Sequence, residues 1–154
     1  MLTEQTPAPD FSLLADDGST VTLASLRGRP AVIYFYPKDN TPGCTKESCD
    51  FRDAFPRIAT SKAAIIGVSP DSVASHVKFK RKYQLPFTLL ADQEHQMAEA
   101  YGVWKKKSLF GVSYMGIERT TFLLDKNGVI VKIFSKVKPI GHAAKVEAAL
   151  RALP

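Results

Sequence analysis

Two cysteines five positions apart are the residues best suited to chemistry. Cys44 and Cys49 are the only cysteines of the 154 residues, and they lie in the segment PKDNTPGCTKESC, residues 37–49. In a reducing compartment a close cysteine pair is more often catalytic or metal-binding than structural. A zinc site needs four ligands, and no clustered histidines complete the set here. The pair therefore indicates thiol chemistry.

The residues before Cys44 predict that it lies in the first turn of a helix. Thr41 is a favoured N-cap residue, and Pro42 suits the first helical position, where its missing N–H costs nothing. Free backbone N–H groups and the positive end of the helix dipole meet in the first turn. Both favour the thiolate, which is the nucleophilic form of cysteine. The alternative is that Cys44 is simply a small buried helix residue.

The same helix places the two cysteines on different faces. At about 100° per residue, three apolar residues of this helix point within about 40° of the direction of Cys44: Phe51, Phe55 and Ile58. Cys49 points about 140° away and lies about 7.5 Å further along the axis. A disulfide needs Cα atoms within roughly 7 Å and converging Cβ vectors. Either the pair never bonds, or the helix unwinds locally when it does.

The rest of the chain predicts an α/β fold around this segment. Continuous apolar runs such as AVIYFY and AAIIGV are typical of strands buried on both faces. Strand patterns lie at 11–14, 20–23, 31–36, 63–68, 87–90, 120–124 and 129–134, and helical patterns at 42–59, 70–83, 93–101 and 142–152. Strands that alternate with helices, then a hairpin and a last helix, indicate an α/β sandwich with a mixed sheet, compatible with a thioredoxin-like core. We expect one domain over 1–154, with a loop at 103–118.

Composition and charge argue against several other classes. The net charge is +6, but the positive residues are spread along the chain, and no nucleic-acid motif accompanies them. The N-terminus has no signal-peptide pattern, and no apolar stretch approaches the ~18 residues of a membrane span. We therefore expect a cytoplasmic protein without nucleic-acid or membrane partners. We expect no cofactor, since no metal, haem, flavin or nucleotide motif is present.

The cysteine segment resembles the active-site motif of the peroxiredoxin family. That motif is Pro, three residues, Thr or Ser, two residues and Cys, and PKDNTPGC places Pro37, Thr41 and Cys44 at this spacing. The second cysteine in CTKESC is similar to the branch called peroxiredoxin Q or bacterioferritin comigratory protein. The resemblance runs almost end to end, through PDFSLLADDGSTVTLASLRG, GVSPDSVASHVKF, LPFTLLAD, AEAYGVW and GIERTTFLLDKNG. It implies a thioredoxin-like peroxiredoxin fold with an N-terminal β-hairpin.

The resemblance also implies a role for each residue of the motif. Cys44 would attack the O–O bond of hydrogen peroxide or an organic hydroperoxide and become a sulfenic acid. Thr41 would hold the peroxide or orient the sulfur, and Pro37 would shield the sulfur from bulk water. Arg119 would stabilise the thiolate and bind peroxide oxygen. Cys49 would form an intramolecular disulfide that a thioredoxin-type dithiol reduces, in an enzyme expected to be a monomer.

Each of these residues also has a simpler explanation. Thr41 can be only a helix cap, Pro37 can merely end a strand, and Arg119 can be a surface strand residue. Glu47 is expected to help orient Arg119, or else to be a solvated helix residue. We expect the three histidines to be non-catalytic surface residues: His76, His95 and His142.

Two other functions remain as alternatives to a peroxidase. A thiol–disulfide oxidoreductase on the same core would carry a Cys-x-x-Cys pair, whereas four residues separate the cysteines here. A basic binding or holdase-like protein would work without Cys44.

Overall fold

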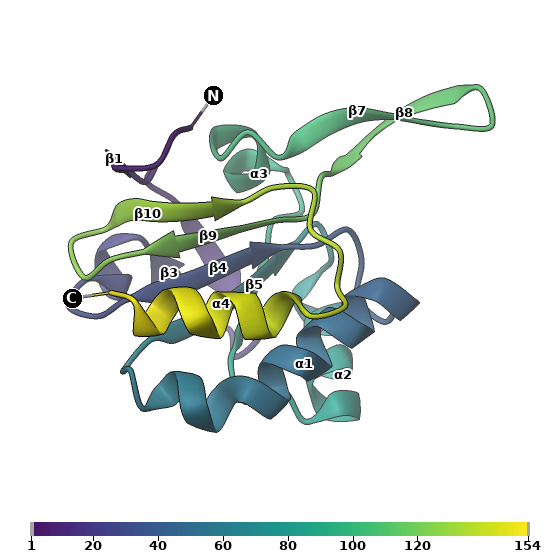
Figure 1. Cartoon of the computed structure of the whole chain (residues 1–154). Coiled ribbons are helices and arrows are strands. Elements are labelled where there is room, and N and C mark those ends of the chain that lie inside the picture. The colour runs from purple at the N-terminus through teal and green to yellow at the C-terminus, as the bar shows by residue number, and fades with distance from the viewer. Residues whose placement is uncertain (1, 154) are drawn as a thin grey trace.

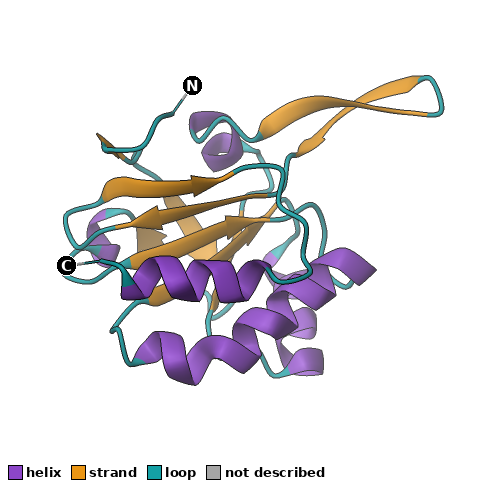
Figure 2. Ribbon diagram, in the orientation of Figure 1, coloured by secondary structure: helices purple, strands orange, loops and turns teal. Residues whose placement is uncertain are grey.

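The computed structural model describes residues 2–153 and is built around a mixed β-sheet (Figures 1 and 2). Its eight strands lie in the order β1 (Thr6–Pro7), β10 (Val129–Phe134), β9 (Thr120–Leu124), β4 (Ala31–Phe35), β5 (Ala64–Ser69), β6 (Thr88–Ala91), β2 (Ser12–Ala15) and β3 (Thr20–Thr22). The central strands β4, β5 and β6 run parallel, and the other neighbouring pairs are antiparallel. The expected mixed sheet and the N-terminal hairpin β2–β3 are confirmed.

Helices cover both faces of the sheet, and this explains the uninterrupted apolar strands. One face packs against α1 (Pro42–Ala59), α2 (Val73–Tyr83) and α4 (His142–Arg151), and the other against α3 (Gln96–Ala100) (Figure 1). A short 3-10 helix, η1 (Ala24–Leu26), also contributes to the second face. In β4 every residue is buried, and alternate side chains join the two apolar clusters.

The expectation of a loop over residues 103–118 was wrong. This segment forms a two-stranded hairpin, β7 (Trp104–Leu109) and β8 (Val112–Ile117), that projects from the body (Figure 1). Its turn residues, Phe110 and Gly111, both have positive φ. The sequence concealed the hairpin because β7 carries three consecutive lysines in place of an apolar alternation, and because Phe-Gly is not a common hairpin turn pair.

The sheet register brings Arg119 to the start of α1. β4 lies next to β9, with Phe35 opposite Thr120 at the end of the ladder. Arg119 directly precedes β9, so it lies beside the point where the chain leaves β4 for α1. The antiparallel pairing of these two strands therefore joins residues 37–49 to a side chain some seventy positions later.

No helix within residues 2–153 is both long and apolar enough to cross a membrane.

Candidate active site

Cys44 is buried in the first turn of α1, as the sequence predicts. Thr41 occupies the N-cap position, and the first helical hydrogen bond runs from Thr45 N to Thr41 O (2.8 Å). The Thr41 hydroxyl does not cap the helix; it donates to Lys38 O at 2.9 Å. The backbone N–H groups of Gly43 and Cys44 precede the first helical hydrogen bond and are left without an intrahelical acceptor. They remain available to an oxygen atom beside the sulfur.

Arg119 contacts the sulfur of Cys44 directly. Its Nη2 donates to Cys44 Sγ at 3.2 Å, and its side chain is only 15% exposed. The alternative that it is a surface strand residue was wrong. Gly43 makes room for this approach, because a Cβ at that position would lie 3.2 Å from Arg119 Nη2. A guanidinium in this place stabilises a thiolate and presents fixed donors next to it.

Glu47 binds the other half of the same guanidinium. Arg119 Nη1 donates to Glu47 Oε1 at 2.6 Å, which is the orienting contact expected from the sequence. Burial raises the pKa of the Glu47 carboxyl to about 7, although Arg119 opposes the change. Burial alone would lower the pKa of Arg119, but Glu47 and Cys44 raise it by more. Arg119 therefore stays charged, while the charge on Glu47 changes near neutral pH.

His142 lies behind Glu47, and its expected place on the surface was wrong. It begins α4 with 4% of its surface exposed, and its Nε2 lies 2.7 Å from Thr121 Oγ1 and 4.0 Å from Glu47 Oε2. Burial lowers the pKa of His142 to about 4, with Lys145 and Arg119 contributing. The ring is thus neutral at neutral pH. The sequence did not reveal this, because the burial of a histidine depends on partners from other elements.

Cys49 has a different environment from Cys44. It is half-buried, both cysteines are free thiols, and α1 is continuous through both positions, as the helical wheel indicated. Burial raises the pKa of Cys49, although Arg52 opposes the change. Of the two sulfurs, Cys44 therefore has the contacts that favour a reactive thiolate.

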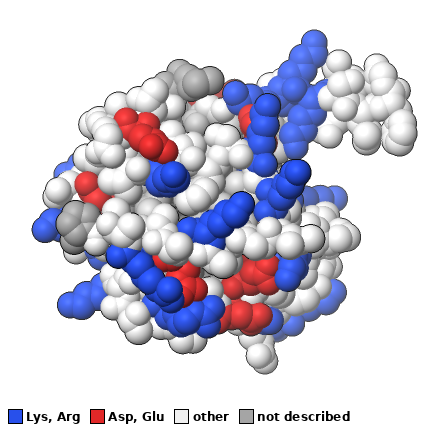
Figure 3. Space-filling model, viewed as in Figure 1, with Lys and Arg blue, Asp and Glu red and all other residues white. Residues whose placement is uncertain are grey.

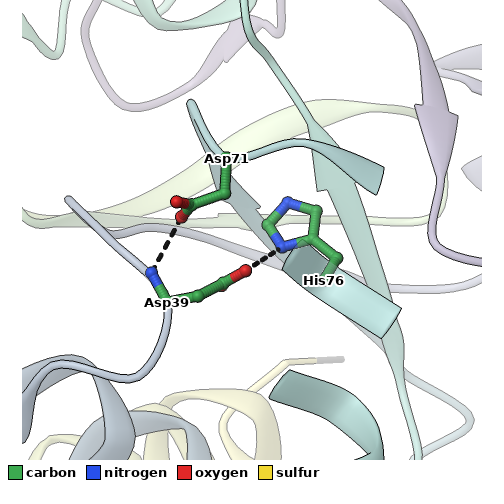
Figure 4. Close-up of side chains that lie close together, drawn as sticks. All are labelled: Asp39, Asp71 and His76. Carbon is green, nitrogen blue, oxygen red and sulfur yellow. Dashed lines mark hydrogen bonds and ion pairs between the residues drawn. The ribbon is translucent and has the colours of Figure 1, made fainter. Parts of the chain in front are cut away.

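The loop at residues 36–41, which includes the half-buried Pro37, is held by a buried carboxylate–imidazole pair. Asp39 Oδ2 lies 2.7 Å from His76 Nδ1, and Asp39 N donates to Asp71 Oδ2 at 2.8 Å (Figure 4). His76 Nε2 faces a backbone carbonyl of β6 at 2.9 Å, so this nitrogen carries a hydrogen. The expected surface position of His76 was wrong, since it is fully buried.

The same cluster has the residue types of a metal site. Within residues 2–153, ligand atoms of Asp39, Asp71 and His76 lie within 4.8 Å of one another. Asp39 also accepts hydrogen bonds from Tyr36 Oη (2.6 Å) and Ser75 Oγ (2.8 Å). Both carboxylate oxygens of Asp39 and both nitrogens of His76 thus have partners in the protein. Hydrogen bonding accounts for the cluster, which ties the loop to α2 and β6.

The remaining histidine lies away from the sulfur. His95 is half-buried and stacks on Trp104, with ring centroids 3.8 Å apart.

Together these contacts describe a buried nucleophile with donors fixed around it. Cys44 supplies the sulfur, and Arg119 and the first-turn N–H groups supply hydrogen-bond donors. Such donors stabilise an oxygen that gains negative charge as its bond breaks.

Comparison with known proteins places this arrangement in a family. Residues 5–133 match the family model described as the AhpC/TSA family. The chain is 56% identical to peroxiredoxin Bcp of Bacillus subtilis over 138 residues, 90% of this chain and 88% of that protein. It is 50% identical to a putative peroxiredoxin bcp of Coxiella burnetii over 139 residues, covering 90% and 92% of the two chains.

Solved structures agree with the sequence comparison. Peroxiredoxin Q of Xanthomonas campestris superimposes with a TM-score of 0.89 at 44% identity, over 92% of this chain and 90% of that one. A further structure of the Xanthomonas protein concerns its alkyl peroxide reduction activity. Peroxidoxin BcpB of Mycobacterium tuberculosis gives a TM-score of 0.89 at 34% identity, over 100% and 99% of the chains. The expected thioredoxin-like peroxiredoxin fold is confirmed.

Glu47 should make stability depend on pH. The folded protein keeps a proton on Glu47 up to a pH of about 7, whereas the unfolded chain releases it near 4.5. Between these values the folded state binds more protons, so the free energy of unfolding falls as pH rises, by up to about 3 kcal/mol. Urea unfolding at pH 5 and pH 7.5 should show a smaller fall for Glu47→Gln than for wild type. Asp53→Asn, which removes an exposed carboxylate of the same helix, serves as control and should keep the wild-type fall; an equal fall in Glu47→Gln would contradict the assignment.

The Asp39–His76 pair should stabilise the fold. Asp39→Asn disrupts the buried hydrogen bonds that Asp39 Oδ2 makes with His76 and Ser75, and we expect urea unfolding to show a loss of about 2 kcal/mol at pH 7. Asp53→Asn is the matched control, because it breaks an exposed pair with Arg52 and should change stability little. If both variants lose the same small amount, the buried pair does not hold the loop.

Proposed function

The chain belongs to the AhpC/TSA family of peroxiredoxins, and from this we propose a cysteine cycle in which Cys44 attacks the peroxide and Cys49 resolves the product. The protein is a thiol peroxidase. The observation that carries the assignment of Cys44 is the 3.2 Å contact from Arg119 Nη2 to its sulfur in the first turn of α1.

In the first step the Cys44 thiolate attacks one oxygen of the hydroperoxide. An S–O bond forms as the O–O bond breaks, and the departing oxygen leaves as an alcohol, or as water from hydrogen peroxide, after taking up a proton. Arg119 holds the oxygen that gains charge. The Thr41 hydroxyl donates to Lys38 O, so its lone pairs can accept a hydrogen bond from the hydroperoxide. Pro37, in the same loop, shields the sulfur from water.

In the second step the Cys49 sulfur attacks the sulfenic acid. An S–S bond forms and water leaves. Because α1 is continuous through both cysteines, its first turns must open for the sulfurs to meet. Opening also exposes Cys49 to water, which removes the burial that raises its pKa and makes its thiolate easier to form.

We further propose the setting in which the cycle runs. A thioredoxin-type dithiol reduces the disulfide by exchange, and the enzyme acts as a monomer in the cytoplasm. The whole chain works as one catalytic domain. Support for a protein reductant comes from the position of Cys49, which is already half-exposed before α1 opens.

The cycle can be tested by intact mass after one equivalent of hydrogen peroxide. Wild type should lose about two mass units, as one disulfide forms. Cys49→Ser should instead stop at a sulfenic acid that a dimedone probe traps, and Cys44→Ser should remain unmodified. If Cys44 stays a free thiol in wild type, the proposal fails.

Disulfide formation should open the start of α1. Hydrogen exchange on reduced and oxidised protein should show lost amide protection at residues 44–49, because an intact helix cannot join the two sulfurs. Protection in α4 serves as the internal control and should stay the same. Unchanged protection at 44–49 in the disulfide form would contradict the opening step.

A further inference from the structure

The β7–β8 hairpin ends in exposed apolar side chains. Phe110 is 95% exposed, Val112 65% and Leu109 55%, and these three residues are called the hairpin tip below. Figure 3 shows the tip as the uncharged far end of an arm that projects from the body. Clusters of exposed apolar side chains mark interaction sites more often than single ones do. A two-stranded hairpin is only marginally stable by itself. Exposed apolar side chains at its tip add no packing that would stabilise it.

The turn at the tip is built from an unfavourable residue. Phe110 has φ 52° and Gly111 φ 78°, the signs of a type I′ turn. Asn-Gly is strongly preferred for such a turn, and a bulky residue at positive φ is unusual. Phe110 is therefore not explained by turn formation. Its side chain, which points into solvent, is the feature left to explain.

Polarity changes in layers along the arm. Below the tip, Ser108 faces Ser113, and the next two pairs combine lysines with amphipathic or apolar side chains, Lys107 with Tyr114 and Lys106 with Met115. At about 3.3 Å per residue, Lys107 lies roughly 10 Å from Phe110. Interfacial segments bury their apolar groups about 5–10 Å into a bilayer, and lysines extend to the headgroups.

From this layering we propose that the hairpin tip inserts into the surface of an anionic lipid bilayer, with Lys106 and Lys107 at the headgroups. This is a surface contact and needs no spanning segment. It involves no residue of the Cys44 site, so it can fail without affecting the proposed function, and the reverse also holds.

Charge and shape favour a lipid surface over a protein partner. A second copy would bring together Lys106 and Lys107 of both arms, on molecules that each carry a net charge of +6. Leu109 and Val112 are paired across the two strands and Phe110 lies beyond them in the turn, so the apolar side chains sit at the narrow end of the arm. A convex tip of this kind requires a matching cleft in a protein, whereas lipid chains adapt to it. An anionic surface also complements the lysines.

The experiment is co-sedimentation of the full-length reduced protein with vesicles. We expect binding to vesicles that contain phosphatidylglycerol, little binding to pure phosphatidylcholine, and weaker binding at high salt. Phe110→Asn creates the preferred Asn-Gly turn, so it should keep or raise the melting temperature and keep peroxide turnover, while vesicle binding falls about tenfold or more. Phe110→Trp should retain binding. Lys106→Gln combined with Lys107→Gln should also weaken binding about tenfold or more.

Three results would overturn the proposal. The first is that wild type does not sediment with anionic vesicles, and the second is that Phe110→Asn binds them as well as wild type. A concentration-dependent dimer in sedimentation velocity that Phe110→Asn abolishes, without vesicle binding, would assign the tip to a second copy instead.

Discussion

The Arg119 guanidinium is the group on which the rest of the site depends. Its two terminal nitrogens contact two different partners: Nη2 the sulfur of Cys44 and Nη1 the carboxyl group of Glu47. The β4–β9 register delivers this side chain to the start of α1, and the missing side chain of Gly43 admits it. A charge that is mostly buried needs such pairing to be stable. The sheet, the glycine and the helix start therefore serve one electrostatic arrangement.

The balance of charge around Arg119 is set by burial. Glu47 titrates near neutral pH, while His142 stays neutral beside it. When Glu47 holds a proton, it does not offset the positive charge of the guanidinium beside the sulfur of Cys44. When Glu47 loses the proton, its carboxylate forms an ion pair with the guanidinium. The charge next to the sulfur of Cys44 thus changes near neutral pH.

Much of the fold could be predicted from local pattern, because β4 and β5 are continuous apolar runs and α1 has a clear start. The helix start and the family motif also brought Cys44 and Arg119 together correctly, although their catalytic roles stay predictions. The features that could not be predicted depend on contacts between residues far apart in the sequence. His76 and His142 look like surface residues until Asp39, Thr121 and Glu47 are placed around them. The β7–β8 hairpin was missed because its contacts with the core are confined to its base, where Ile117 is buried and Trp104 packs against the same apolar cluster.

The continuity of α1 has a consequence for survival under oxidant stress. In the proposed cycle the sulfenic acid waits until the first turns of the helix open, and during that wait a second peroxide can oxidise it irreversibly to a sulfinic acid. Disulfide formation and irreversible oxidation therefore compete, and the opening equilibrium at the start of α1 decides how often each occurs. A sequence change that made this helix start more rigid would give a protein that resists unfolding better but is inactivated sooner by peroxide.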